Sequence, residues 1–294
     1  CGKSQEEAAA LLGAPILGPV SKGSGAKKII ALDKLWSPEA NSLRAVRDNM
    51  MLSVGSKTLR TLLVTSSDSG EGKSYLSTNL AVTMASPGTN MAAVIASPGS
   101  KVILVDADLR KPSLHELFDM PNLLGLADVL AMPEVVALGM LKKALRPTHI
   151  ANLMLLPAGR NPLDPGSLVS SPNFAKVLEY LKTQADLIVI DSGPLLEVVE
   201  TKVIANQADG VVLVVSNGRS SRRHAKRSIQ YFKHNPSINF LGLVFNRVNL
   251  RGGYGYGYDV GAQKFGQLDK TKKPATLWQK SGPLNDPNPA KAPP

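Results

Sequence analysis

The eight residues from Ser67 to Ser74 have the composition and spacing of a phosphate-binding loop. They follow the apolar run 61–65, which predicts a strand, and precede the segment 75–85, which predicts a helix. Glycines let the backbone N–H groups of such a loop turn inward, and the start of the helix adds partial positive charge. A lysine can then reach the outer phosphates of a nucleotide, and the following hydroxyl can bind Mg²⁺.

One position of this loop departs from the usual pattern, because Ser67 stands where such loops have glycine. Serine is small, and the strand before the loop and the helix after it are both predicted. We therefore interpret the segment as a nucleotide site. The alternative is a Gly/Ser turn that happens to precede a lysine. The residues expected to contact the nucleotide are Ser69, Gly70, Glu71, Gly72, Lys73, Ser74 and Tyr75.

Three carboxylates follow two further apolar runs. Asp106 and Asp108 come at the end of the run 102–106, and Asp191 follows the run 187–190. The carboxyl ends of parallel strands open onto the ligand crevice of an α/β sheet, so these side chains should meet the phosphates there. Carboxylates in that place can hold Mg²⁺, directly or through water, and one can accept a hydroxyl proton. The alternative, solubilising charge at strand ends, does not explain their place beside a phosphate loop.

A glycine-rich segment near the carboxyl end, 251–259, holds Tyr254, Tyr256 and Tyr258, half of the six tyrosines in the chain. Alternating glycines make such a segment too flexible to pack a core. Two interpretations are a low-complexity linker and a stacking surface for single-stranded nucleic acid. Beside a nucleoside triphosphate site there is a third, a set of flexible phosphate acceptors.

The elements around these motifs alternate between strand and helix from residue 61 onward, with strands predicted at 61–65, 102–106, 153–156, 187–190, 211–215 and 240–245. We expect an α/β fold with a doubly wound, mostly parallel sheet, the phosphate-loop NTPase architecture of the MinD/ParA type, and a flexible C-terminal tail. The expected division is a linker at 1–35, a nucleotide-binding domain at 36–250, the tyrosine cluster at 251–259 and a disordered tail at 260–294. Ser37 and Pro38 predict a helix start.

Composition excludes several classes of protein. In 294 residues, 43% of them apolar, no apolar run is long enough to span a membrane. The single cysteine, Cys1, excludes a disulfide framework and a cysteine metal cage. A net charge of +11 suggests an acidic partner. Nucleic acid is an unlikely one, because the basic clusters at 219–227 and 264–273 are not interleaved with aromatic residues.

With these motifs in place, the chain resembles the bacterial tyrosine kinases, autokinases that regulate the polymerisation and export of capsular polysaccharides and exopolysaccharides. The resemblance covers about residues 35–258. The segments that carry it are 69–74, 103–112, 187–191 and the cluster Tyr254, Tyr256 and Tyr258. It implies a protein-tyrosine kinase that uses ATP and Mg²⁺ and phosphorylates the tyrosine cluster of a neighbouring subunit in trans.

The resemblance also implies roles for single residues. Lys73 binds the β- and γ-phosphates, and Ser74, Asp108 and Asp191 surround Mg²⁺. Asp106 is the leading candidate for activating the acceptor tyrosine, although the division of roles between Asp106 and Asp108 stays open. Asn246, just past the last predicted strand, reads the adenine edge by analogy with related ATPases. The family often has Thr or Ser where this chain has Tyr75.

Family members assemble as rings through a helix with the pattern Glu-x-x-Arg-x-x-Arg. Arg44 and Arg47 match it, but Asn41 stands at the glutamate position, which predicts a weakened ring. Because the chain begins with Cys1 and not with Met, we expect a piece of a larger, membrane-anchored protein at the cytoplasmic face of the bacterial inner membrane. The expected partners are other copies of the chain, the membrane domain of a polysaccharide co-polymerase and a tyrosine phosphatase.

Two alternatives to a kinase remain. A ParA/MinD-type ATPase shares the fold, but its phosphate loop carries an extra lysine near its start, where this chain has Asp68. Such an ATPase also has no use for three tyrosines in a glycine loop. The other alternative is a nucleotide-sensing scaffold without kinase output, against which the intact Lys73, Asp106, Asp108 and Asp191 argue.

Overall fold

The computed structural model describes residues 12–21, 29, 37–86 and 100–248. In these ranges an eight-stranded sheet has the order β1-β8-β7-β2-β6-β3-β5-β4. Every pairing is parallel except that of β4 with β5. The strands are β1 (Ile16–Ser21), β2 (Thr61–Ser66), β3 (Val102–Ala107), β4 (Arg146–Pro147), β5 (Leu153–Leu156), β6 (Leu187–Ser192), β7 (Gly210–Ser216) and β8 (Phe240–Val248).

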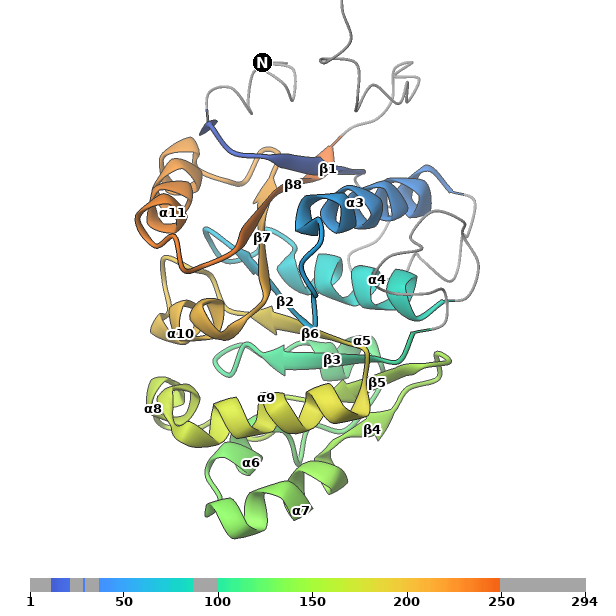
Figure 1. Cartoon of the computed structure of the whole chain (residues 1–294), viewed down its shortest axis with the longest axis vertical. Coiled ribbons are helices and arrows are strands. Elements are labelled where there is room, and N and C mark those ends of the chain that lie inside the picture. Colours follow the sequence, from blue (N-terminus) through green and yellow to red (C-terminus); the bar gives the residue numbers. More distant parts are fainter. Residues whose placement is uncertain (1–11, 22–28, 30–36, 87–99, 249–294) are drawn as a thin grey trace, which may run out of the picture. The chain divides into compact units, whose positions relative to one another are not determined.

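Helices cover both faces of this sheet (Figure 1). On one face α3, α4 and α5 contribute to a buried apolar cluster, and the other helices pack against a second cluster on the opposite face. The helices are α3 (Pro38–Val54), α4 (Lys73–Ala85), α5 (Leu114–Leu117), α6 (Leu126–Leu130), α7 (Glu134–Ala144), α8 (Pro165–Ser170), α9 (Pro172–Gln184), α10 (Val199–Gln207) and α11 (Arg222–His234). The expected doubly wound α/β fold of the phosphate-loop NTPases is confirmed.

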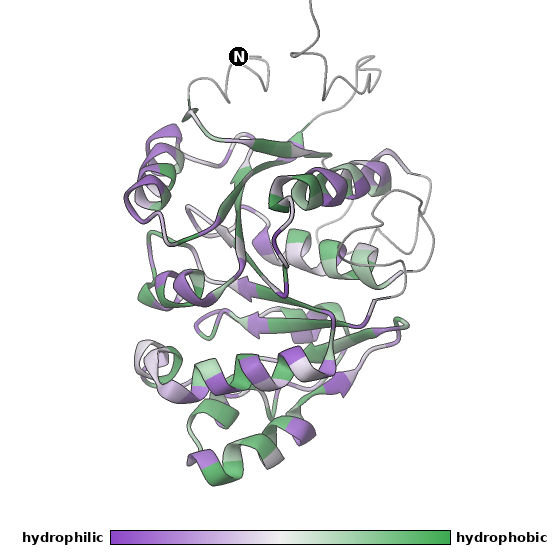
Figure 2. Cartoon of the chain, viewed as in Figure 1, coloured by the Kyte–Doolittle hydropathy of each residue, from purple (hydrophilic) through white to green (hydrophobic). Residues whose placement is uncertain are grey.

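The central strands β2, β3 and β6 are buried along their whole length and mostly apolar, because both faces of the sheet are covered. Figure 2 shows the strands as largely hydrophobic, whereas α11 is mostly hydrophilic. Burial of this apolar surface is the main favourable contribution to folding. All six strands predicted from the apolar runs are present, and their carboxyl ends lie at one edge of the sheet.

Helix α3 begins where the sequence predicts. The Ser37 hydroxyl accepts a hydrogen bond from Ala40 N at 3.1 Å, and Pro38 occupies the first helical position. Both residues suit a helix start. The serine hydroxyl accepts from an N–H that has no partner within the helix, and proline lacks an N–H at a position where the helix would leave it unpaired.

No strand was predicted in the linker segment 1–35, and the structure corrects this. Strand β1 lies in that segment and pairs in parallel with β8 at the edge of the sheet. Its sequence, ILGPVS, hides the strand signal because glycine and proline interrupt it. An edge strand tolerates Pro19, since one side of its backbone needs no partner.

Other expectations lie beyond the reach of the structure. The tyrosine cluster at 251–259 and the tail at 260–294 fall outside the described residues. The division of the chain into domains stays a prediction. None of the helices in the described ranges is long and apolar enough to cross a bilayer.

Candidate nucleotide and phosphoryl-transfer site

The phosphate loop connects β2 to α4, and the helix begins at Lys73, two residues earlier than predicted. Gly70 and Gly72 have φ angles of +77° and +100°. Residues with a side chain rarely adopt such angles, which explains the two glycines. Together with Lys73, Ser74 and Tyr75, these glycines line a surface cavity in which a nucleotide can bind.

The buried carboxylate of Glu71 fixes the backbone at the start of the phosphate loop. It accepts hydrogen bonds from Ser67 N at 2.8 Å and Asp68 N at 3.0 Å, and one from the Ser220 hydroxyl. Burial raises the pKa of Glu71, and the hydrogen bond from Ser220 works in the opposite direction. The side chain of Glu71 therefore shapes the loop and does not line the cavity.

Ser67, which breaks the usual loop pattern, has a structural role of its own. Its hydroxyl accepts a hydrogen bond of 2.9 Å from Ser228 of α11, and both side chains are buried. The Asp68 carboxylate also contacts Nδ1 of His224, one turn earlier on that helix, at 2.6 Å. The first residues of the loop are thus attached to α11.

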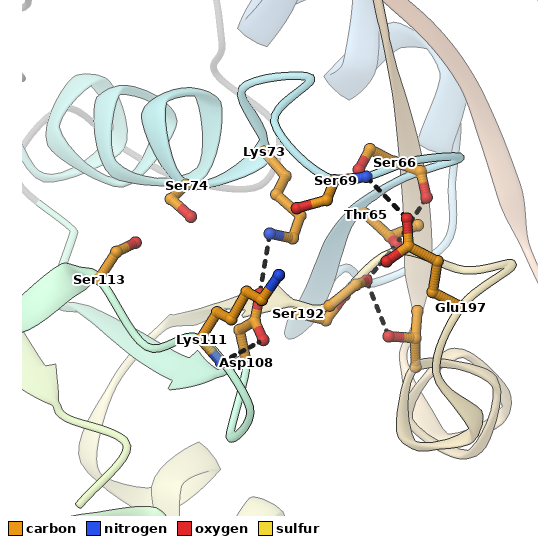
Figure 3. A network of polar contacts seen from close by, with 12 residues as sticks. Thr65, Ser66, Ser69, Lys73, Ser74, Asp108, Lys111, Ser113, Ser192 and Glu197 are labelled. Atoms are coloured by element: carbon orange, nitrogen blue, oxygen red, sulfur yellow. Dashed lines mark hydrogen bonds and ion pairs between the residues drawn. The ribbon is translucent and has the colours of Figure 1, made fainter. Parts of the chain in front are cut away.

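Lys73 and Asp108 form an ion pair at the mouth of the loop, with 2.8 Å between Nζ and Oδ2 (Figure 3). Both side chains are almost fully buried. Burial alone would lower the pKa of Lys73, but the charges of Asp191 and Asp108 outweigh it and raise the pKa. The lysine is therefore a permanent cation, oriented by a carboxylate until an anion arrives.

Asp106 and Asp191 lie side by side, since they are register partners on the neighbouring strands β3 and β6. Burial and then the charge of Asp191 raise the pKa of Asp106 to about 8. Burial also raises the pKa of Asp191, to about 6, although the charge of Lys73 opposes it. Asp106 is oriented by hydrogen bonds from Ser113 N at 3.1 Å and Leu114 N at 3.0 Å.

Neither carboxylate oxygen of Asp191 has a hydrogen-bond partner of normal geometry among the described residues, although the Ser74 and Ser77 hydroxyls lie near enough to lower its pKa. Buried polar atoms in folded proteins are nearly always satisfied, so an orphaned carboxylate points to an absent ligand. In the described part of the chain no three His, Cys, Asp or Glu side chains form a metal cage. Mg²⁺ commonly takes one or two protein oxygens together with water and phosphate oxygens. These residues therefore fit Mg²⁺ that binds with a nucleotide.

The two raised pKa values predict how the stability of the metal-free protein depends on pH. A carboxyl group whose pKa is higher in the folded chain holds its proton more tightly there, so stability falls as the pH rises through the window between the two values. For Asp106 this window runs from about 4, the ordinary value, to about 8.

Replacing Asp106 by Asn removes this titration. In EDTA, the melting temperature of Asp106→Asn should therefore rise relative to the wild type as the pH is raised from about 5 to about 8. The exposed Asp119 provides the control variant, Asp119→Asn. If the difference in melting temperature between the wild type and Asp106→Asn stayed constant across this pH range, the raised pKa of Asp106 would be contradicted.

The structure places Asn246 inside β8 and against the phosphate loop. Its Nδ2 donates to Glu71 O at 2.9 Å, and its Oδ1 accepts from Arg247 N at 2.9 Å. One Nδ2 hydrogen and one Oδ1 lone pair remain for a ligand, so the reading of an adenine edge stays a prediction. Tyr75 lines the cavity, and burial followed by the charge of Glu39 raises its pKa to about 12.

Arg44 and Arg47, the predicted ring residues, lie on α3 in different surroundings. Arg44 donates to Asn41 Oδ1 at 2.8 Å on the surface. Arg47 is buried, pairs with Asp48 at 2.8 Å and donates to Thr83 O of α4 at 3.3 Å. A contact of Arg47 with another copy would therefore require its release from α4.

Besides Ser220, His224 and Ser228, sequence reasoning missed two more residues that contact the loop. Glu197, in the connection after β6, accepts a hydrogen bond from Ser69 N at 3.0 Å (Figure 3). Arg247 donates from Nη1 to Gly70 O at 3.0 Å and lines the same cavity. Neither residue belongs to a recognisable motif. Only the order of the strands brings them to the loop.

No family model matches the chain. It is 31% identical over 229 residues to the putative tyrosine-protein kinase CapB of Staphylococcus aureus, covering 78% of this chain and 93% of that protein. Tyrosine-protein kinase YwqD of Bacillus subtilis is 31% identical over 233 residues, with coverage of 79% and 91%. The putative tyrosine-protein kinase EpsB of Ralstonia nicotianae is 30% identical over 239 residues, 81% of this chain and 30% of that longer protein.

Two solved structures are also similar to this chain. The chimeric protein CapA2B2 superimposes with a TM-score of 0.72 at 28% identity, covering 84% of this chain and all of that one. The BceF tyrosine kinase domain superimposes with a TM-score of 0.69 at 25% identity, covering 83% and 98%.

Proposed function

The chain belongs to the bacterial tyrosine kinase family and is a protein-tyrosine kinase, and we propose that it transfers the γ-phosphate of ATP to Tyr254, Tyr256 and Tyr258 of a neighbouring copy. The observation that carries this proposal is the buried pair of Lys73 and Asp108 at a phosphate loop, beside Asp106 and Asp191. Phosphoryl transfer needs little more than positioning and charge neutralisation, which these groups provide.

In the proposed mechanism, the loop N–H groups and Lys73 bind the triphosphate. The lysine leaves Asp108 for the β- and γ-phosphates, where its charge stabilises the negative charge that develops during transfer. Ser74, Asp191 and Asp108 would hold Mg²⁺, which neutralises phosphate charge when it is bound. Asp191, whose carboxylate makes no hydrogen bond of normal geometry among the described residues, is better placed for this than Asp108, which already accepts from Lys73 and from Lys111 N.

The acceptor tyrosine must lose its hydroxyl proton during transfer. A carboxylate whose pKa approaches the working pH is a better proton acceptor than an ordinary aspartate. Burial raises the pKa of Asp106, and this residue is the candidate for the role. The hydrogen bonds from Ser113 N and Leu114 N fix the orientation of its carboxylate.

Transfer in trans can be tested by mixing two variant chains, neither of which can phosphorylate its own tyrosine cluster. One chain carries Lys73→Met and intact tyrosines, and the other carries Phe at positions 254, 256 and 258 with an intact site. We expect phosphotyrosine to form on the Lys73→Met chain, at a rate that rises with protein concentration. If the mixture stays unphosphorylated while the wild type phosphorylates itself at a concentration-independent rate, transfer occurs within one chain.

We further propose that the kinase works in the synthesis or export of a capsular polysaccharide or exopolysaccharide, at the cytoplasmic face of the inner membrane. Its partners would be a co-polymerase membrane domain and a tyrosine phosphatase. Family membership supports this. Cells that carry Lys73→Met should make polysaccharide of altered length or amount, and unchanged polymer would contradict the proposal.

A further inference from the structure

The described residues that line the nucleotide cavity include two cations, Lys73 and Arg247. Lys73 is matched by the carboxylate of Asp108. Arg247, at the end of β8, donates from Nη1 to Gly70 O at 3.0 Å and to the Ser216 hydroxyl at 3.2 Å. Both of these acceptors are neutral, and within the described ranges no carboxylate forms an ion pair with this guanidinium. Its charge is therefore still available to an anion.

The backbone of Arg247 is held in an unusual conformation, with a φ angle of +59°. Residues other than glycine enter this region rarely, and they stay there only where the surrounding structure fixes them. Here the Arg247 N–H donates to Asn246 Oδ1, and Asn246 is itself bound to the loop through Glu71 O. The same contacts that brace the loop thus fix the position from which the Arg247 side chain reaches it.

The electrostatic surroundings of Arg247 also favour an anion. Burial and then the positive charge of Arg219 lower the pKa of Arg247, whereas the smaller effect of the Glu71 charge opposes them. Two guanidinium groups near one loop repel each other, and a bound triphosphate would relieve this repulsion. A guanidinium has five N–H donors, and the two hydrogen bonds found here come from Nη1 alone. The donors on Nε and Nη2 can serve a ligand.

We propose that Arg247 is a phosphate-binding residue of the ATP site, anchored to the outer side of the phosphate loop by Nη1 and contacting the bound triphosphate with its remaining donors. This inference rests on the proposed function in that it takes ATP as the ligand. The competing possibility is a purely structural role, in which Arg247 fastens the loop through Gly70 O and never touches the nucleotide.

The test compares Arg247→Gln with Arg219→Gln. Arg219 also lies close to Gly70 but does not line the cavity, so its variant controls for the loss of one charge near the loop. Dissociation constants for ATP and for adenosine would be measured by displacement of a fluorescent ATP analogue. Because hydrogen bonds to charged groups are worth more than neutral ones, we expect Arg247→Gln to weaken ATP binding about tenfold or more. The loss for adenosine, and for ATP with Arg219→Gln, should be no more than about threefold.

Each other result has a definite meaning. If the dissociation constant of Arg247→Gln for ATP stayed within about twofold of the wild-type value, this inference would be overturned and the proposed function would stand. An equal loss for ATP and adenosine would show that Arg247 acts through the shape of the loop, and would overturn it as well. If the wild-type chain bound no ATP, the proposed function and this inference would fail together.

Discussion

Replacing Lys73 by Met should abolish tyrosine phosphorylation by the purified chain. Lys73 is the cation that the structure places between the phosphate loop and Asp108, and methionine keeps most of its length but none of its charge. Loss of one preorganised charge-stabilising group typically slows a reaction by about a hundredfold to a thousandfold. We expect at least that decrease in the rate of phosphotyrosine formation from Mg²⁺·ATP, measured with a phosphotyrosine antibody.

The variant leaves Asp108 buried without its partner, so its folding must be checked by circular dichroism. Lys176→Met is a suitable control, because Lys176 forms an exposed ion pair with Glu134 on the far helices α9 and α7. That control should phosphorylate at the wild-type rate. A folded Lys73→Met chain with more than about a tenth of wild-type activity would contradict the assigned role of the lysine.

Replacing Gly72 by Ala should remove nucleotide binding. A Cβ atom at this position would lie 2.0 Å from Asn246 Nδ2, and the φ angle of +100° is unfavourable for any residue with a side chain. Asn246 cannot easily yield, because it is buried and bound to Glu71 O. The strain alone should cost about 1–3 kcal/mol of stability. We expect no binding of ATP at concentrations that saturate the wild type, measured by calorimetry.

Gly139→Ala provides the matched control, since nothing lies within 4 Å of a Cβ atom at that position of α7. This substitution should leave ATP binding unchanged, and alanine suits the helix better than glycine does. Wild-type ATP affinity in Gly72→Ala would mean that the loop differs from the one described here.

Local signals were sufficient to predict the sheet and the main site residues. Buried parallel strands are continuous apolar runs, so β2, β3 and β6 could be recognised directly, and the residues after such strands must lie at one edge of the sheet. This places Lys73, Asp108 and Asp191 together without any knowledge of the detailed packing. The structure confirms that proximity, whereas the chemical role of each residue stays a proposal.

The remaining contacts depend on packing between distant segments, which no local pattern encodes. The hydrogen bond between Ser67 and Ser228 joins residues 161 positions apart, and it gives a role to a serine that looked like a defect in the motif. Likewise, Asn246 and Arg247 reach the loop only because β8 follows β7 in the sheet. Strand β1 was missed because an edge strand can contain Pro19 and Gly18, which the rules for buried strands exclude.

The central claim is that this chain phosphorylates its own tyrosine cluster, and mapping of phosphotyrosine by mass spectrometry after incubation with Mg²⁺·ATP tests it most directly. We predict phosphate on Tyr254, Tyr256 or Tyr258 of the wild type and none on the Lys73→Met chain incubated alone. Hydrolysis of ATP without any phosphotyrosine on these residues would contradict the claim and would favour an ATPase of the ParA/MinD type.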